Sequence, residues 1–183
     1  MKKVVVFLAD GFEEVEALTT VDLLRRAGAD VQMISINEDA AVCGAHDITV
    51  QADFTFGEAE IDDADAVVLP GGMPGTINLK NHRGVEKTVL DFYKSGKLVC
   101  AICAAPMVLG ELNLLKGKKA CCYPGMENYL LGADVEKGPV SVDGNIITGV
   151  GVGGAIKFAL EIVKYLYDGE TAAELKESIV DIF

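Results

Sequence analysis

A cysteine in the middle of the chain stands where its thiol could act as a nucleophile. The apolar run Leu98–Ile102 predicts a buried strand that ends directly before Cys103, and Pro106 suits the first turn of a following helix. Ala101 and Ala105, two positions to either side, leave room for a sharp turn, as glycines do in G-x-S-x-G. The spacing therefore predicts a nucleophile elbow. A thiol at a helix N-terminus should have a pKa below about 8.5.

Two other interpretations of this cysteine stay open. Cys103 could be a small buried apolar residue, as most free cysteines are. It could also form a C-x-x-C redox pair with Cys100. The pair is disfavoured, because an extended strand holds residues i and i+3 roughly 10 Å apart, which is beyond disulfide reach.

A glycine-rich loop follows the predicted strand at 66–69. Gly71 and Gly72 lack side chains, so the backbone can approach a ligand closely, and the Gly72 N–H could donate to an oxyanion beside Cys103. A plain Gly/Pro turn is the alternative. The carboxyl ends of parallel strands are where ligands gather in open α/β sheets, and both loops should lie there.

Three glutamates lie where the first strand passes into the first helix. Glu13, Glu14 and Glu16 would stabilise the helix N-terminus. A carboxyl group beside a thiol would also have a raised pKa and could exchange a proton with it. The spacing alone does not say which glutamate does so.

A literal G-x-G-x-x-G occurs at 149–154, after a predicted strand and before a predicted helix. A dinucleotide site needs this motif in a leading βαβ unit, and no further strand follows here. The motif therefore favours a close-packing or anion-facing turn, and we expect no organic cofactor and no metal.

The elements around these loops predict an α/β fold. Continuous apolar runs indicate strands that are covered on both faces, at 4–9, 31–36, 66–69, 98–102 and 145–148. Helices are predicted at 13–27, 84–94, 104–115, 155–167 and 171–178, and Val15, Leu18, Val21 and Leu24 should face inward in the first of them. Segments 42–51 and 134–147, with a turn at Asp143-Gly144, are predicted to add antiparallel strands to the main sheet.

Composition limits the class of protein. The chain has 183 residues, of which 50% are hydrophobic, so we expect one domain over residues 1–183. A net charge of −12 disfavours nucleic acid as a partner. No apolar run approaches the roughly 20 residues of a membrane span, and the N-terminus has no export signal. We expect a cytoplasmic protein whose five cysteines stay reduced.

Four segments together resemble the ThiJ/PfpI superfamily, and its DJ-1 branch most closely. They are the segments at 8–17, 21–28, 69–72 and 101–106, in that order along the chain. The resemblance implies a flavodoxin-like three-layer sandwich, a homodimer, and Cys103 as nucleophile with Glu16 as its carboxylate partner. It also implies that the N–H groups of Gly72 and Ala104 are the oxyanion donors.

The chain departs from the superfamily at some positions. Superfamily proteases place histidine after the nucleophile, where Ala104 stands here, and many branch members have histidine at the position of Tyr123. Val150 occupies the place of an anion-binding arginine in a human member of the branch. The histidines, His46 and His82, lie outside these motifs and are expected to be ordinary surface or loop residues. A Cys-His protease or amidase mechanism therefore lacks its base.

Together with these residues, the resemblance implies a cysteine-dependent, cofactor-free enzyme of the glyoxalase or deglycase type, which acts on small reactive dicarbonyls or their adducts. Gly71, Tyr123 and Val150 are expected to line its substrate pocket. A redox-sensing stress-response protein or chaperone, acting through oxidation of Cys103, is the alternative. A non-catalytic dimer that binds a partner chain is a third possibility.

Overall fold

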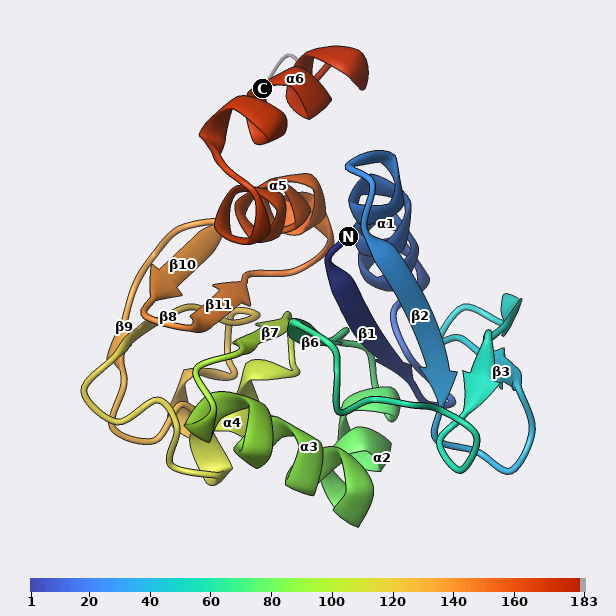
Figure 1. Cartoon of the computed structure of the whole chain (residues 1–183). Coiled ribbons are helices and arrows are strands. Elements are labelled where there is room, and N and C mark those ends of the chain that lie inside the picture. Colours follow the sequence, from blue (N-terminus) through green and yellow to red (C-terminus); the bar gives the residue numbers. More distant parts are fainter. Residues whose placement is uncertain (182–183) are drawn as a thin grey trace.

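The predicted apolar strands form the centre of the molecule. In the computed structural model, which describes residues 1–181, seven strands make one sheet in the order β10-β11-β7-β6-β1-β2-β5 (Figure 1). Their bounds are β1 Lys3–Leu8, β2 Asp30–Ser35, β5 Phe54–Thr55, β6 Ala66–Leu69, β7 Leu98–Ile102, β10 Val140–Asp143 and β11 Ile146–Gly149. Neighbouring strands are parallel, except that β10 runs antiparallel to β11. The predicted, mostly parallel sheet is confirmed.

Helices cover both faces of the sheet (Figure 1). On one face lie α1 Glu14–Arg26, α5 Ala155–Leu166 and α6 Gly169–Ser178; on the other lie α2 Gly75–Asn81, α3 Arg83–Lys94 and α4 Pro106–Glu111. This arrangement confirms the flavodoxin-like three-layer α/β sandwich. In the part of the chain that the structure describes, no helix is long and apolar enough to cross a membrane.

The strands are apolar at every position because each face of the sheet packs against its own hydrophobic core. In β1, Val4, Val6 and Leu8 pack in the core under α1 and α5, whereas Val5 and Phe7 pack in the core under α3. All five side chains are fully buried. Successive residues of a strand point to opposite faces, so a strand that is covered twice needs an apolar residue at every position.

The inward face predicted for α1 is partly wrong. Val21 and Leu24 are buried, but Val15 and Leu18 are 48% and 37% exposed. The first turn of the helix lies at the carboxyl edge of the sheet and buries two glutamates in place of the apolar residues. Backbone N–H groups of neighbouring loops donate hydrogen bonds to both carboxylates, as described below, so the helix can turn a polar face inward there.

The two antiparallel segments behave differently. In the second segment, β10 joins the main sheet through the turn at Asp143-Gly144 as predicted, whereas residues 134 and 135 pair in parallel with residues 119 and 120 outside that sheet. The other segment does not join it: β3 Ala41–Cys43 and β4 Thr49–Gln51 form a separate hairpin. The outer edge of β2 is already paired with β5, so the hairpin packs against the loop between β1 and α1.

Smaller elements complete the chain. A two-stranded parallel ribbon consists of β8 Lys119–Ala120 and β9 Asp134–Val135, and the 3-10 helices are η1 Glu127–Tyr129 and η2 Val152–Gly154. Helix α2 was not predicted from the sequence. Helix α4 ends at Glu111, before the predicted end at Leu115.

Candidate active site

Four loops meet at one edge of the sheet. They follow β1, β6, β7 and β11, which are neighbours in the sheet and parallel, so their carboxyl ends lie side by side. Hydrogen bonds join the loops: the Glu13 N–H donates to the Gly71 carbonyl and the Cys103 N–H to the Gly149 carbonyl, both at 2.9 Å. The convergence predicted for the loops at Cys103, Gly71 and the glutamates is present.

Cys103 lies in a sharp turn between β7 and α4. Its φ is 65°, in the left-handed region that residues other than glycine rarely adopt. The turn closes through a hydrogen bond from the Ala105 N–H to the Ile102 carbonyl, and Pro106 begins α4 as predicted. This strained backbone projects the thiol away from the sheet, where it is only partly buried.

Two backbone N–H groups act on the sulfur of Cys103. They belong to Ala104, the next residue, and to Gly72, and both hydrogen bonds lower the pKa of the thiol. Gly72 has a φ of 90°, and a Cβ atom at this position would overlap the backbone of Glu13 and Gly11. The chain therefore needs glycine here to turn this N–H toward the sulfur.

Glu16 is the glutamate that reaches the thiol. It extends from the first turn of α1 and is fully buried. Its Oε2 accepts a hydrogen bond of 2.9 Å from the Gly71 N–H, while Oε1 has no hydrogen-bond partner among the described residues. A Cβ atom built on Gly151 would lie 3.7 Å from this Oε1 and 3.8 Å from the Cys103 Sγ, so both atoms border the same space.

Burial and the shared space change the acidity of both groups. Burial raises the pKa of Glu16 to about 7, although the neighbouring Cys103 thiol and the Gly71 N–H oppose this shift. Burial and the adjacent Glu16 carboxylate raise the pKa of Cys103 to about 12. The lowered pKa predicted from the helix N-terminus is therefore wrong. Between these two pKa values the two groups hold one proton between them, and that proton lies on the thiol.

A cavity of about 780 Å³ opens above the sulfur. It is lined by Glu13, Val15, Glu16, His46, Gly72, Cys103, Tyr123, Pro124, Val150, Gly151, Val152 and Gly153. Tyr123 and Val150 thus lie where the sequence predicts them. Gly71, which was expected to line the pocket, does not line this cavity; its N–H donates to Glu16 instead. A Cβ atom at Gly71 would come within 2.5 Å of the Cys103 Cβ and 2.7 Å of the Glu16 Oε2.

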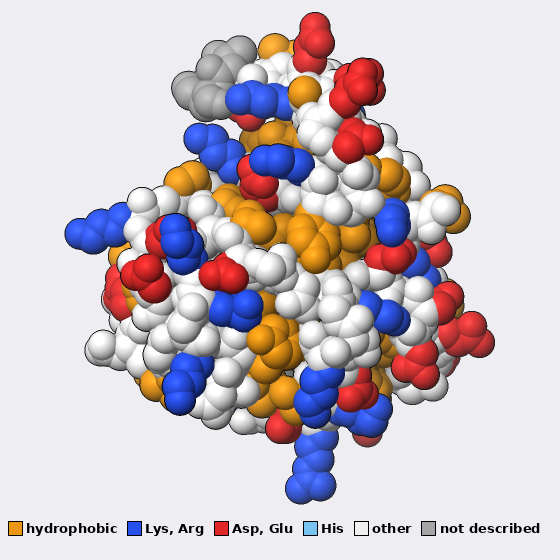
Figure 2. All heavy atoms as spheres, turned by 60° about the vertical axis from the view of Figure 1, so that its left-hand side comes forward, with side chains coloured by type: hydrophobic (Ala, Val, Ile, Leu, Met, Phe, Trp, Pro, Cys, Tyr) orange, Lys and Arg blue, Asp and Glu red, His pale blue; other side chains and the backbone are white. Residues whose placement is uncertain are grey.

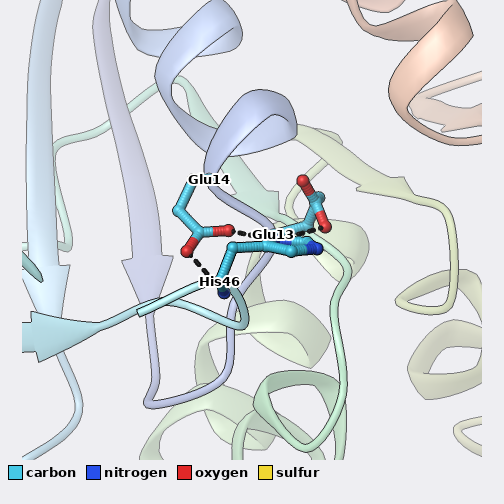
Figure 3. A group of neighbouring side chains, drawn as sticks. All are labelled: Glu13, Glu14 and His46. Carbon is cyan, nitrogen blue, oxygen red and sulfur yellow. Dashed lines mark hydrogen bonds and ion pairs between the residues drawn. The ribbon is translucent and has the colours of Figure 1, made fainter. Parts of the chain in front are cut away.

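His46 is the residue that sequence analysis missed. It lies in the β3–β4 turn and, although its side chain is 66% exposed, it lines the cavity. Its imidazole lies between the carboxylates of Glu14 and Glu13 (Figure 3). Its Nδ1 is 2.9 Å from the Glu14 Oε2 and 3.5 Å from the Glu13 Oε2. No motif marks this histidine, because only the tertiary contact of the hairpin brings it to the site.

Of the other sequence candidates, Cys100 and His82 have structural roles. Cys100 is fully buried in the core, and both it and Cys103 are free thiols, so no C-x-x-C disulfide is present. The G-x-G-x-x-G segment forms the loop after β11, and Gly151 and Gly153 line the cavity. His82 caps α3, where its Nδ1 accepts a hydrogen bond from the Val85 N–H.

A second hollow, of about 380 Å³, lies between β10, α5 and α6. Figure 2 shows hydrophobic side chains on this face, with basic and acidic side chains around them. Its lining contains Val140, Leu160, Lys157 and Lys164, but neither cysteine nor histidine among the described residues. The cavity above Cys103 differs from this hollow in combining a cysteine and a histidine with carboxyl groups.

Comparisons with known proteins agree with this architecture. The family model described as the DJ-1/PfpI family matches residues 2–165. Protein dj-1beta of Drosophila melanogaster is 36% identical over 185 residues, covering 98% of this chain and 97% of that protein. Deglycase PfpI of Pyrococcus furiosus is 34% identical over 167 residues, covering 90% and 99%.

Some relatives are longer than this chain. Protein DJ-1 homolog B of Arabidopsis thaliana is 38% identical over 181 residues, which are 98% of this chain and 41% of that protein. Homolog A of the same plant is matched over 46% of its length. The chain therefore spans less than half of these two relatives.

Solved structures show the same fold over the whole chain. The C103A mutant of a DJ-1 superfamily protein from Salmonella typhimurium is 40% identical with a TM-score of 0.95, and all of both chains is covered. Oxidised DJ-1 of Toxoplasma gondii is 34% identical with a TM-score of 0.96, again over both chains. The resemblance noted in the sequence is confirmed, and the chain belongs to the DJ-1/PfpI family.

Proposed function

We propose that this protein is a cysteine-dependent enzyme that converts small reactive dicarbonyls, such as methylglyoxal, or their adducts into hydroxy acids. Cys103 is the nucleophile at the elbow, Glu16 is its acid-base partner, and the N–H groups of Gly72 and Ala104 are the oxyanion donors. One observation carries the proposal: a fully buried carboxyl group with a pKa of about 7 borders the same space as a thiol. Relatives named deglycase agree with it.

The first step is addition of sulfur to the aldehyde. Cys103 gives its proton to Glu16, and the thiolate forms a C–S bond with the aldehyde carbon. The electron pair of the C=O bond moves to oxygen, next to the two N–H groups that act on the sulfur. Glu16 returns the proton to this oxygen, which gives a hemithioacetal and leaves a carboxylate.

The second step moves hydrogen between adjacent carbons. The Glu16 carboxylate removes the proton from the former aldehyde carbon and delivers it to the neighbouring carbonyl carbon, while the hydroxyl proton of the first carbon passes to the oxygen of the second. The first carbon is oxidised to a thioester and the second is reduced to an alcohol. Water then cleaves the thioester, so the sum is one dicarbonyl plus one water to one hydroxy acid. No external oxidant or cofactor is needed.

The cavity favours uncharged substrates. Its described lining contains the carboxyl groups of Glu13 and Glu16 but neither lysine nor arginine, and Val150 stands where a human relative of the branch has arginine. A substrate carboxylate would lie near these acidic groups and would be repelled. We therefore place neutral dicarbonyls ahead of anionic ones.

Replacement of the nucleophile tests the proposal. Cys103→Ala should abolish conversion of methylglyoxal to lactate, measured by loss of the dicarbonyl and appearance of the acid. The control is Cys43→Ala, because Cys43 is an exposed free thiol that does not line the cavity. Turnover by Cys103→Ala at the rate of the unmodified protein would refute the mechanism.

Oxidation of Cys103 is a second candidate function, and the unpartnered Glu16 Oε1 favours it. A protonated Glu16 could donate a hydrogen bond to a sulfinate, beside the N–H groups of Gly72 and Ala104. We expect Glu16→Ala to reduce the fraction of protein that carries two added oxygens at a given peroxide dose, as measured by intact mass. An unchanged oxidation profile would count against this role.

The proposal includes a homodimer in the cytoplasm. Val15 and Leu18 of α1 and Ile48 of the β3–β4 turn are apolar and exposed, which suits a surface that a second copy covers. The five cysteines are free, as expected in a reducing compartment. Sedimentation of the purified protein would test the dimer, and cell fractionation would test the location.

A further inference from the structure

The β3–β4 turn is fixed against the start of α1. The Gly11 N–H donates to the Cys43 carbonyl at 2.7 Å, and the Ala45 N–H donates to the Phe12 carbonyl at 2.8 Å. Phe12 and Gly44 also form a β-bridge. These bonds hold His46 above the first turn of the helix, so its place at the cavity is set by backbone contacts.

A buried carboxylate orients the imidazole. Glu14 is only 3% exposed, and its Oε1 accepts hydrogen bonds from the His46 N–H at 2.7 Å and the Ile48 N–H at 3.5 Å. Its Oε2 lies 2.9 Å from the His46 Nδ1. A Cβ at Gly44 would overlap the Glu14 side chain, so the turn makes room for this carboxylate. Both oxygens of Glu14 are thereby satisfied inside the protein.

This geometry decides which nitrogen of His46 is basic. Burial opposes ionisation of Glu14, but the hydrogen bonds from the His46 ring and from backbone N–H groups bring its pKa below the ordinary value. An ionised carboxylate can only accept, so the His46 Nδ1 carries a hydrogen. The lone pair of the neutral ring is then on Nε2, which has no hydrogen-bond partner among residues 1–181.

The charges around His46 strengthen it as a base. The hydrogen bond with Glu14 and the negative charges of Glu13, Glu14 and Asp47 raise its pKa above the usual value of 6.5. Across the cavity stand Glu16 and Cys103, which carry the shared proton. A metal ion at Glu13, Glu14 and His46 is less favoured, although their ligand atoms lie within 4.8 Å of one another, because Glu14 already has its partners.

The proposed reaction leaves one step without a base. Glu16 is fully buried and serves the sulfur and the adjacent carbons, whereas water must enter from solvent through the mouth of the cavity. We propose that His46, oriented by Glu14, is the general base that activates the water for hydrolysis of the Cys103 thioester. This inference rests on the proposed function, because it names the residue for its last step.

The step is balanced as follows. Nε2 of His46 takes one proton from water, and the hydroxide forms a C–O bond with the thioester carbon. The tetrahedral oxyanion is held by the N–H groups of Gly72 and Ala104. When it collapses the C–S bond breaks, the hydroxy acid leaves, and the proton on His46 is passed through water to restore the Cys103–Glu16 pair.

Loss of this base should trap the acyl-enzyme. With methylglyoxal, His46→Gln should show a burst of about one dicarbonyl consumed per Cys103, followed by turnover about 10²–10⁴-fold slower than in the unmodified protein. Intact mass should show one lactoyl group on Cys103 in His46→Gln but not in the unmodified protein. Above the pKa of His46 the unmodified enzyme should release product faster, and this pH dependence should be lost in His46→Gln.

Matched variants separate catalysis from structure. Glu14→Gln should also accumulate the adduct, because the ring loses its orientation. Imidazole added to His46→Ala should restore deacylation, since the site is open to solvent. His82→Asn is the control: it replaces the other histidine, keeps an acceptor at the cap of α3, and should behave like the unmodified protein.

The outcomes distinguish the two proposals. Turnover at the unmodified rate by His46→Gln, or slow turnover without an adduct, would overturn the role of His46 while leaving the function of Cys103 intact. If the unmodified protein neither consumes methylglyoxal nor acquires an adduct, and the variant behaves likewise, the proposed function fails and this inference falls with it.

Discussion

The Gly71 N–H donates a hydrogen bond of 2.9 Å to the Glu16 Oε2, and this bond joins the loop after β6 to the first turn of α1. It fixes one oxygen of a buried carboxyl group and leaves the other beside the sulfur of Cys103. The pKa of Glu16 therefore depends in part on a backbone N–H group, which only a substitution by proline would remove. Its effects can be measured through stability as well as through activity.

Glu16→Gln should change how stability depends on pH. The folded protein binds the Glu16 proton up to a pKa of about 7, whereas the ordinary value is 4.5. Because the folded pKa is raised, this stabilisation is full below the unfolded pKa and is lost as pH rises through the folded one. The loss amounts to about 3 kcal/mol between the two pKa values. When the unfolding free energy is measured with denaturant at a series of pH values, Glu16→Gln should lack this dependence on pH.

The control for that measurement is Glu13→Gln, which leaves Glu16 in place and should keep this dependence on pH. A constant difference in unfolding free energy between the unmodified protein and Glu16→Gln from pH 4.5 to pH 7 would show that Glu16 does not hold its proton in the folded state.

Gly71→Ala should damage both folding and activity. An added Cβ would come within 2.5 Å of the Cys103 Cβ and 2.7 Å of the Glu16 Oε2, so one of these groups must move. We expect a loss of about 1–3 kcal/mol, which is typical of overpacking. Gly57→Ala is the matched control, because a Cβ at that position meets nothing within 4 Å. Equal thermal stability of the two variants would contradict the tight packing behind the thiol.

Val150→Arg should shift substrate preference toward anions. Val150 lines the cavity together with two glutamates, and the new guanidinium would offset their charge. We expect the kcat/KM for glyoxylate to rise about tenfold relative to that for methylglyoxal, which corresponds to roughly 1.4 kcal/mol. Val150→Met, a neutral replacement of similar reach, controls for size. If the ratio of the two kcat/KM values is unchanged, the residue at position 150 does not discriminate between substrates by charge.

Gly44→Ala should slow product release as His46→Gln does, without changing the reactivity of the Cys103 thiol. The new methyl group would overlap the Glu14 side chain, so the carboxylate can no longer orient the imidazole. Alkylation of Cys103 by iodoacetamide should proceed as in the unmodified protein, while product release slows. A fall in both rates to the same degree would place the damage in the fold and not in the pairing of Glu14 with His46.

The sheet and the thiol were predictable because they depend on local patterns. Continuous apolar runs mark strands that are buried on both faces, and Cys103 follows one of them directly. The strand order also brings the carboxyl ends of β1, β6 and β7 together, so the loops at Glu16 and Gly72 could be assigned to one edge.

Other features depend on contacts that the sequence does not encode locally. The buried face of α1 was predicted incorrectly because Glu14 and Glu16 are buried and accept hydrogen bonds from backbone N–H groups of distant loops. The spacing of apolar residues along the helix carries no sign of these bonds. The raised pKa of Cys103 follows first from burial and then from the negative charge of Glu16, which together outweigh the backbone N–H groups at the elbow. His46 was missed because the hairpin that carries it leaves the main sheet.

That hairpin has a consequence for how such proteins diverge. It contributes a histidine to the cavity, yet none of the seven strands of the main sheet depends on it for pairing. Mutations in the turn at 44–48 can therefore alter the chemistry available to the thiol at little cost to the folding of the sheet. Within one ancestral scaffold, this separation would let new activities evolve from a short surface segment while the nucleophile and its carboxyl partner stay unchanged.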